Sequence, residues 1–252
     1  MRCYAFRKES KEETLTEHVV GIATCLKEIW ETEGLKQKLM KVYKVSKSLV
    51  NDLLLSAAIL HDIGKAEEEL QNTCKEECSS FKHHYVISAL LALKLGYEVQ
   101  ELNLSPDNIE TRIRRLLINR NLNYLDLGDA YLLIVVLPVL LHHYAQIVNE
   151  YSILDGLSTA KRYIKIHKDC VDELKTVINE LRNTFESETG REILNKLENL
   201  ITKETIEPAF INEKLIQDSC SYEYIPGRLV VEATTGILNL CDGRVAYKNR
   251  RP

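Results

Sequence analysis

Apolar residues recur at helical spacing along most of the 252-residue chain, and this periodicity leaves little sequence for a β-sheet. Residues 14–33 give the clearest case, because Thr14 and Glu17 have the spacing of a capping box, which marks the start of a helix. The apolar stripe of this segment comprises Leu15, Val19, Ile22, Leu26 and Ile29. The pattern predicts a helix here, with His18 on or beside its apolar face.

Two further apolar segments predict helices in the middle of the chain. One begins near Ser48 as its N-cap and ends at Gly64, and another covers residues 80–95. Residues 129–150 predict a third helix, which Pro138 interrupts or restarts because proline has no N–H to donate.

The remaining segments complete a helical domain. We expect a shorter helix with loops over residues 97–128, a helical hairpin over 156–200 and one helix around 230–241. Only "RLVVEATT" resembles a strand. The sequence therefore predicts one all-α domain over residues 1–252.

Composition indicates an ordinary globular protein, 45% hydrophobic and 28% charged. Its apolar runs fall short of the roughly 20 residues that span a bilayer, and the N-terminus lacks the apolar core of a signal peptide. We therefore expect a soluble, cytoplasmic protein with no membrane partner. Seven cysteines, an odd number between Cys3 and Cys241, predict reduced thiols. The net charge of −4 gives no general attraction to nucleic acid.

Five of the seven histidines fall on apolar helical segments. They are His18, His61, His84, His142 and His143. A single histidine on an apolar face is usually a satisfied core residue. Burying five is costly, because each ring has a donor and an acceptor that need partners. Binding to a shared metal centre removes this cost, since neutral imidazole is a preferred ligand of transition metals.

A structural zinc site is an alternative for one of these histidines. Cys74 and Cys78 precede His83 and His84, and such residues can bind zinc. A zinc finger, however, needs a longer separation between its two ligand pairs and histidines that are not adjacent. Loop cysteines before a helix explain the segment better.

The pair His61-Asp62, followed by Ile63-Gly64-Lys65, is the sharpest sign of a metal site. Adjacent residues of a regular helix point about 100° apart, so they cannot share one ordinary partner. Where the helix breaks at Gly64, both can reach a metal. An aspartate can also bridge two metal ions, whereas an imidazole cannot.

The order of these residues resembles the HD superfamily of metal-dependent phosphohydrolases. It runs from His18 through His61-Asp62, His84 and the pair His142-His143 to Asp242. This order is most similar to one branch, the HD nuclease of the CRISPR type I helicase–nuclease, in its stand-alone form. The resemblance implies an all-α helical bundle with a dinuclear metal site in its core.

The resemblance also implies a role for each residue of the site. Asp62 would bridge two divalent ions and Lys65 would contact a phosphate oxygen. One ion would be held by His18, His61, Asp62 and Asp242, and the other by Asp62, His84, His142 and His143. His84 is preferred to His83 because family members often carry His-Glu-x-x-Ser, and Ser88 stands four residues after His84, although Tyr85 replaces the glutamate.

Two such ions can activate water, neutralise the scissile phosphate and stabilise the leaving oxygen. Histidine and carboxylate ligands are compatible with Mn, Fe, Co, Ni or Zn, and with Mg or Ca at one site. The resemblance therefore implies a nuclease that degrades single-stranded DNA, and RNA as well, in CRISPR antiviral interference. A separate helicase subunit is expected, because the chain has no G-x4-G-K-[ST] phosphate loop.

Two other functions use the same residues. An HD phosphohydrolase of this kind could act on nucleoside triphosphates or cyclic nucleotides, and a non-catalytic HD module could serve as a sensor or scaffold. A path for a polyanion is indicated by the basic segment "IETRIRRLLINRN" and the tail "YKNRRP". A solvated helix face and a basic terminus explain these segments equally well.

Overall fold

The computed structural model describes residues 2–75, 77–143, 155–156, 163–210, 212 and 226–250. Helices dominate these residues, as the sequence predicts. The elements, in chain order, are β1 (Tyr4–Lys8), β2 (Lys11–Thr14), α1 (Leu15–Glu28), α2 (Trp30–Tyr43), α3 (Lys47–Leu60), η1 (Ile63–Ala66), α4 (Glu68–Asn72), η2 (Thr73–Lys75), α5 (His84–Glu98), η3 (Gln100–Leu102), α6 (Ile109–Ile118), α7 (Leu127–Tyr131), η4 (Leu132–Val136), α8 (Leu137–Leu141), α10 (Lys168–Arg182), α11 (Glu188–Ile201) and α13 (Pro226–Asn249).

Side-chain caps fix where the first helices begin. Thr14 and Glu17 form the predicted capping box at the start of α1. The cap of α3 is Ser46, whose side chain accepts a hydrogen bond from the backbone N–H of Leu49, and Ser48 lies inside the helix. The prediction that Ser48 is the cap is therefore wrong by two residues. Ser46 has the extended backbone that an N-cap requires.

The strand prediction is wrong in two ways: the predicted strand near the C-terminus is helical, and the two strands near the N-terminus were not predicted. "RLVVEATT" lies within α13, where Val230, Val231 and Thr234 are buried on the inner face of one long helix. The observed strands, β1 and β2, form an antiparallel hairpin at the N-terminus. A hairpin with charged side chains at most positions lacks the alternation of apolar and polar residues by which strands are recognised.

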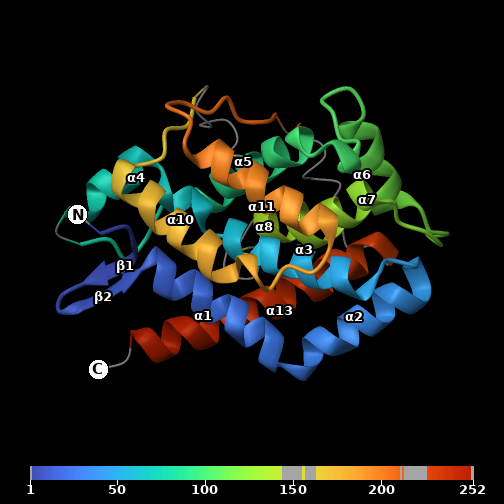
Figure 1. Cartoon of the computed structure of the whole chain (residues 1–252), viewed down its shortest axis with the longest axis horizontal. Coiled ribbons are helices and arrows are strands. Elements are labelled where there is room, and N and C mark those ends of the chain that lie inside the picture. Colours follow the sequence, from blue (N-terminus) through green and yellow to red (C-terminus); the bar gives the residue numbers. More distant parts are fainter. Residues whose placement is uncertain are drawn as a thin grey trace.

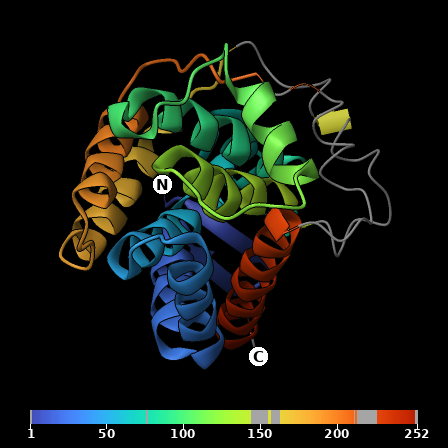
Figure 2. The same ribbon diagram turned by 90° about the vertical axis from the view of Figure 1, so that its right-hand side faces the viewer.

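The core surrounds α3, which is buried along most of its length. Helix α3 contacts the continuous helical segment η4–α8, and α5 packs against α8. Helices α1 and α13 lie side by side on one flank, and α10 and α11 pair on another (Figures 1 and 2). Segment η4 has the wider π-helical turn and precedes Pro138, so the predicted disturbance at this proline is confirmed.

The predicted hairpin over residues 156–200 corresponds to α10 and α11, whose side-chain caps are His167 and Ser187. Residues 157–162 of this prediction lie outside the described part of the chain, as do residues 144–150 of the helix predicted over 129–150. Among the described residues, no helix is both long and apolar enough to cross a membrane.

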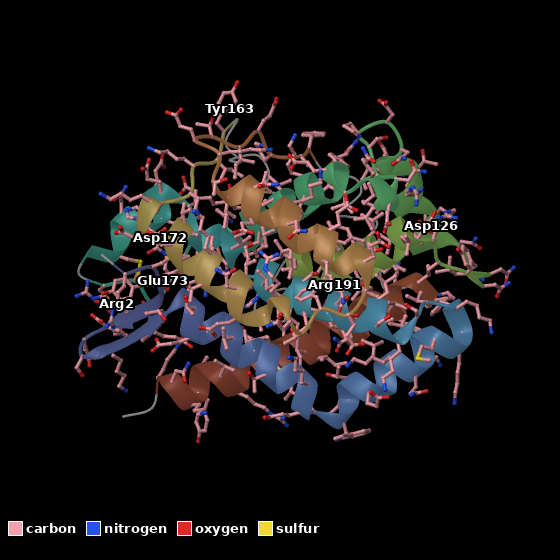
Figure 3. The ribbon with its side chains drawn as sticks, in the orientation of Figure 1. Arg2, Asp126, Tyr163, Asp172, Glu173 and Arg191 are labelled. Carbon is pink, nitrogen blue, oxygen red and sulfur yellow. A yellow bond between two sulfur atoms is a disulfide. The ribbon has the colours of Figure 1, made fainter. Side chains whose placement is uncertain are left out.

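All six cysteines of the described residues form disulfides, which contradicts the prediction of reduced thiols. The pairs are Cys3–Cys170, Cys25–Cys241 and Cys74–Cys78. The first two join residues 167 and 216 positions apart in sequence whose Cα atoms lie 4.9 and 5.6 Å apart. Such pairs come together through helix packing, which the number and spacing of cysteines do not reveal. Near the first pair, Glu173 of α10 accepts hydrogen bonds from Cys3 and Thr16 (Figure 3).

Candidate metal centre

The seven residues predicted to bind metal come from five different parts of the fold. His18 lies on the first turn of α1, His61 caps the C-terminus of α3 and Asp62 follows it. His84 is the first residue of α5, His142 and His143 directly follow α8, and Asp242 lies on α13. Two groups of close donor atoms result: Asp62 with His84, His142 and His143, and Asp62 with His18 and His61.

Asp62 is buried and directs one carboxylate oxygen at each group. Its Oδ2 lies 3.1 Å from Nε2 of His18 and 3.4 Å from Nε2 of His61. Its Oδ1 lies 3.0 Å from Nε2 of His84 and 3.9 Å from Nε2 of His142. The carboxylate thus stands between two sets of imidazoles, in the arrangement that a bridging ligand needs.

Three of the histidines are anchored in the same way. Nδ1 of His61, of His84 and of His142 lies 2.6–2.8 Å from the backbone carbonyl oxygen three residues earlier. Because a carbonyl oxygen can only accept, each Nδ1 carries the proton and each Nε2 presents a lone pair to the cluster. Within the described structure, the buried Nε2 atoms of His18, His61 and His142 form no hydrogen bond, although carboxylate oxygens lie 3.1–3.9 Å from them. Such orphaned buried nitrogens fit a metal ion, which would accept their lone pairs.

The electrostatics of the cluster keep most of these donors in the protonation states that metals require. Burial lowers the pKa of His84 to about 4 and that of His142 well below its usual value, so both rings are neutral at pH 7. For Asp62, burial raises the pKa, but Lys65 and His61 outweigh this and hold it well below the usual range.

His18 is the exception. Burial lowers its pKa, but its contacts with Asp242, Asp62 and Glu13 raise it to about 10. A positive charge is therefore favoured at this point between carboxylates, which a bound cation can supply in place of a proton.

Asp242 is brought to the same place by the long C-terminal helix. Its Oδ1 lies 3.2 Å from Nε2 of His18, which completes the first group. Asp242 does not end its helix before Gly243, because α13 continues to Asn249.

Comparison with known proteins identifies the family. Residues 6–203 match the family model described as "Cas3, HD domain". The chain belongs to this family. The HD domain of Cas3 is a metal-dependent nuclease of CRISPR interference. The match ends before α13, so the case for Asp242 rests on its contact with His18. No curated protein matches the chain.

In this Cas3 HD domain, Lys65 lies beside the bridging carboxylate, with Nζ 2.6 Å from Oδ2 of Asp62. It also lines a cleft of about 570 Å³ that leads from the surface to the cluster. The walls of the cleft include Phe81, His143, Asp242 and Arg250. A substrate in the cleft would therefore meet Lys65 and the cluster together.

Gly64 allows the two central segments of the site to approach each other. Its backbone N–H donates to Oγ of Ser88, 2.8 Å away. A Cβ atom at Gly64 would lie 2.1 Å from the backbone carbonyl oxygen of His84. The glycine after His61-Asp62 is thus required where this turn meets the first turn of α5.

His83 does not join the cluster. It has a left-handed backbone conformation, with φ 59°, and its Nε2 lies 3.2 Å from Oδ2 of Asp155. The zinc alternative for this region is excluded in the described structure, because the sulfur atoms of Cys74 and Cys78 are bonded to each other.

The arginines of "IETRIRRLLINRN" have mainly structural partners. Arg112 pairs with Asp126 and Asp129, Arg115 also pairs with Asp129, and Arg114 pairs with Glu110 on its own helix. Asp126 lies at the far end of the molecule from the β-hairpin (Figure 3). These contacts do not support a polyanion path along α6. Of the tail "YKNRRP", residues 251–252 lie outside the described structure.

One residue of the centre was missed by sequence reasoning. Glu13, on β2, has its Oε1 atom 2.9 Å from Nδ1 of His18. No motif spacing marks a glutamate five residues before a histidine, and the contact exists only because β2 leads directly into α1.

Proposed function

We propose that this Cas3 HD domain cleaves single-stranded DNA, and RNA as well, with two divalent ions bridged by Asp62. The observation that carries the proposal is the position of the Asp62 carboxylate, with one oxygen toward His18 and His61 and the other toward His84 and His142. The residues needed for both ions thus meet at one buried carboxylate.

The proposed ligands fall into two subsites. Subsite A would consist of His18, His61, Asp62 and Asp242, and subsite B of Asp62, His84, His142 and His143. When bound, the two ions would supply Lewis-acid chemistry at the phosphate and activate a water molecule. The mixed nitrogen and oxygen donors are compatible with Mn, Fe, Co, Ni or Zn, and with Mg at one subsite.

The chain's own residues hold and shield this centre. His84 and His142 of subsite B present neutral Nε2 atoms because burial disfavours their protonation. Lys65 can turn from Asp62 toward a phosphate oxygen in the cleft, which it lines. Its positive charge would then offset the negative charge of the scissile phosphate.

The cleft that leads to the cluster supports the proposed preference for single-stranded substrates. The proposed ligands are largely buried, and the cleft that reaches them is bounded by Lys65, Phe81 and Lys82. A duplex is a stiff rod, whereas a single strand can bend into such a cleft. We therefore propose that the chain acts as one nuclease domain in the cytoplasm, with a separate CRISPR helicase supplying the single strand.

Cleavage assays test this proposal. Labelled single-stranded DNA, duplex DNA and RNA, together with nucleoside triphosphates and cyclic nucleotides, are incubated with Mn, Mg, Ni or Co. We expect cleavage of single strands by the wild type and its loss in Asp62→Ala. Asp172→Ala is the matched control, because Asp172 is exposed on α10 (Figure 3).

Three results would contradict the proposal. They are equal activity of the wild type and Asp62→Ala, no activity with any of the four metals, and hydrolysis of mononucleotides alone. The last result would instead establish a phosphohydrolase of small nucleotides.

A further inference from the structure

Glu13 is a buried carboxylate with three side-chain partners. Its Oε1 lies 2.9 Å from Nδ1 of His18 and accepts a hydrogen bond from Nδ2 of Asn249, 2.8 Å away. Its Oε2 accepts from Nε of Arg250 at 2.7 Å. The side chain is fully buried, so these contacts are screened little by solvent. Glu13 thus joins α1 to the end of α13.

The contact with His18 differs from the anchors of the other cluster histidines. His61, His84 and His142 donate Nδ1–H to neutral backbone carbonyls, whereas His18 faces an ionisable carboxylate. A carboxylate on Nδ1 fixes the ring so that Nε2 faces the metal, and it makes Nε2 a stronger donor. The orientation and basicity of His18 therefore depend on a second side chain.

Through its contacts with α13, Glu13 is also linked to Asp242, another ligand of subsite A. Asn249 follows Asp242 by seven residues, about two helical turns, so the two side chains lie on the same face of α13. Glu13 holds this face at Asn249, and the disulfide Cys25–Cys241 holds the helix next to Asp242. The rotation of α13 that brings Asp242 to His18 is thereby fixed at both points.

We propose that Glu13 is a positioning residue for subsite A, through His18 directly and through α13 for Asp242. The inference rests on the proposed two-ion function. Subsite B shares only Asp62 with subsite A, and its His84 and His142 are anchored by backbone carbonyl oxygens rather than by Glu13. Loss of the Glu13 charge should therefore weaken binding of the ion in subsite A and leave binding of the ion in subsite B unchanged.

Cobalt binding tests this selectivity without relying on activity. Metal-free wild type, Glu13→Gln and Glu12→Gln are titrated with Co²⁺ by calorimetry and by visible absorption. We expect two equivalents in the wild type, and in Glu13→Gln one equivalent weakened by about 10- to 100-fold while the other is unchanged. Glu12→Gln removes the same charge from the neighbouring exposed residue and should bind as the wild type does.

A variant that lacks a ligand of subsite B shows which of the two bound Co²⁺ equivalents is weakened. His142→Ala removes a ligand of subsite B, so the tight equivalent that remains reports on subsite A. Adding Glu13→Gln to His142→Ala should weaken that equivalent by the same factor as in the single variant. If Glu13→Gln does not fold, Asn249→Ala replaces it, and a several-fold loss at the same equivalent is expected.

The outcomes separate the two proposals. Wild-type affinity in Glu13→Gln, or equal weakening of both equivalents, would overturn the role of Glu13 and leave the nuclease proposal intact. In the replacement experiment, wild-type affinity in Asn249→Ala has the same meaning. A wild type that binds no Co²⁺ would contradict the two-ion proposal and this inference with it.

Discussion

Replacing Gly64 by alanine should disable the proposed metal centre without removing any ligand. The new Cβ would lie 2.1 Å from the carbonyl oxygen of His84 and 2.9 Å from Oγ of Ser88. Since Cβ atoms essentially never approach other heavy atoms closer than 3.0 Å, the turn and the start of α5 must separate by roughly 1 Å. The 3.0 Å separation between Nε2 of His84 and Oδ1 of Asp62 would open with them.

A misplacement of about 1 Å in catalytic geometry costs about 100-fold in rate, and overpacking costs about 1–3 kcal/mol of stability. We therefore expect Gly64→Ala to cleave single-stranded DNA about 100-fold more slowly at a temperature where it is fully folded. Gly236→Ala is the matched control, because an added Cβ meets nothing within 4 Å there, and it should keep wild-type activity with up to about 1 kcal/mol more stability. Wild-type cleavage by folded Gly64→Ala would refute the reasoning.

Three further predictions concern other parts of the molecule. His142→Ala should abolish cleavage, whereas His83→Ala should keep most of it; similar losses in parallel assays would show the assignment to be wrong. In chelator-treated protein, the free energy of unfolding should fall on the order of 2 kcal/mol between pH 7 and pH 5, because burial lowers the pKa of His84 from 6.5 to about 4 and only the unfolded chain gains the proton in that range. Urea unfolding at both pH values measures this, and a flat profile would contradict it. Arg112→Met should lower the free energy of unfolding by about 1–3 kcal/mol, because it removes a partner of buried Asp129, and should leave single-strand affinity unchanged. Weaker single-strand binding by an Arg112→Met variant of normal stability would instead support a substrate path along α6.

The proximity of the cluster histidines could be predicted because each one lies on or directly next to a helix with a buried apolar face. His61 and Asp62 stand at the end of a buried helix, and His84 begins another. Five imidazoles on apolar helical segments need shared partners, and this need is visible in the sequence before any contact is known. The helical fold followed from the same periodicity.

Other features depend on contacts between distant segments, which periodicity does not encode. In the sequence, Glu13 is one more charged residue of a polar segment. Its contacts with Asn249 and Arg250 exist only because the end of α13 packs beside it in the fold. The disulfides were missed for the same reason. The sequence could not show whether Arg112 forms ion pairs within the protein or lines a substrate path. A charged helix face has the same sequence pattern whether it contacts solvent, nucleic acid or aspartates.

The disulfide Cys25–Cys241 turns most of the chain into a covalent ring, since its cysteines are 216 positions apart. Five of the proposed ligands lie within the ring, while His18 and Asp242 stand on the two tails that leave it. Cleavage of any one peptide bond between the two cysteines would therefore leave every proposed ligand in a single covalent molecule. Fragments of a protein cut once in this way would separate on a denaturing gel only after reduction.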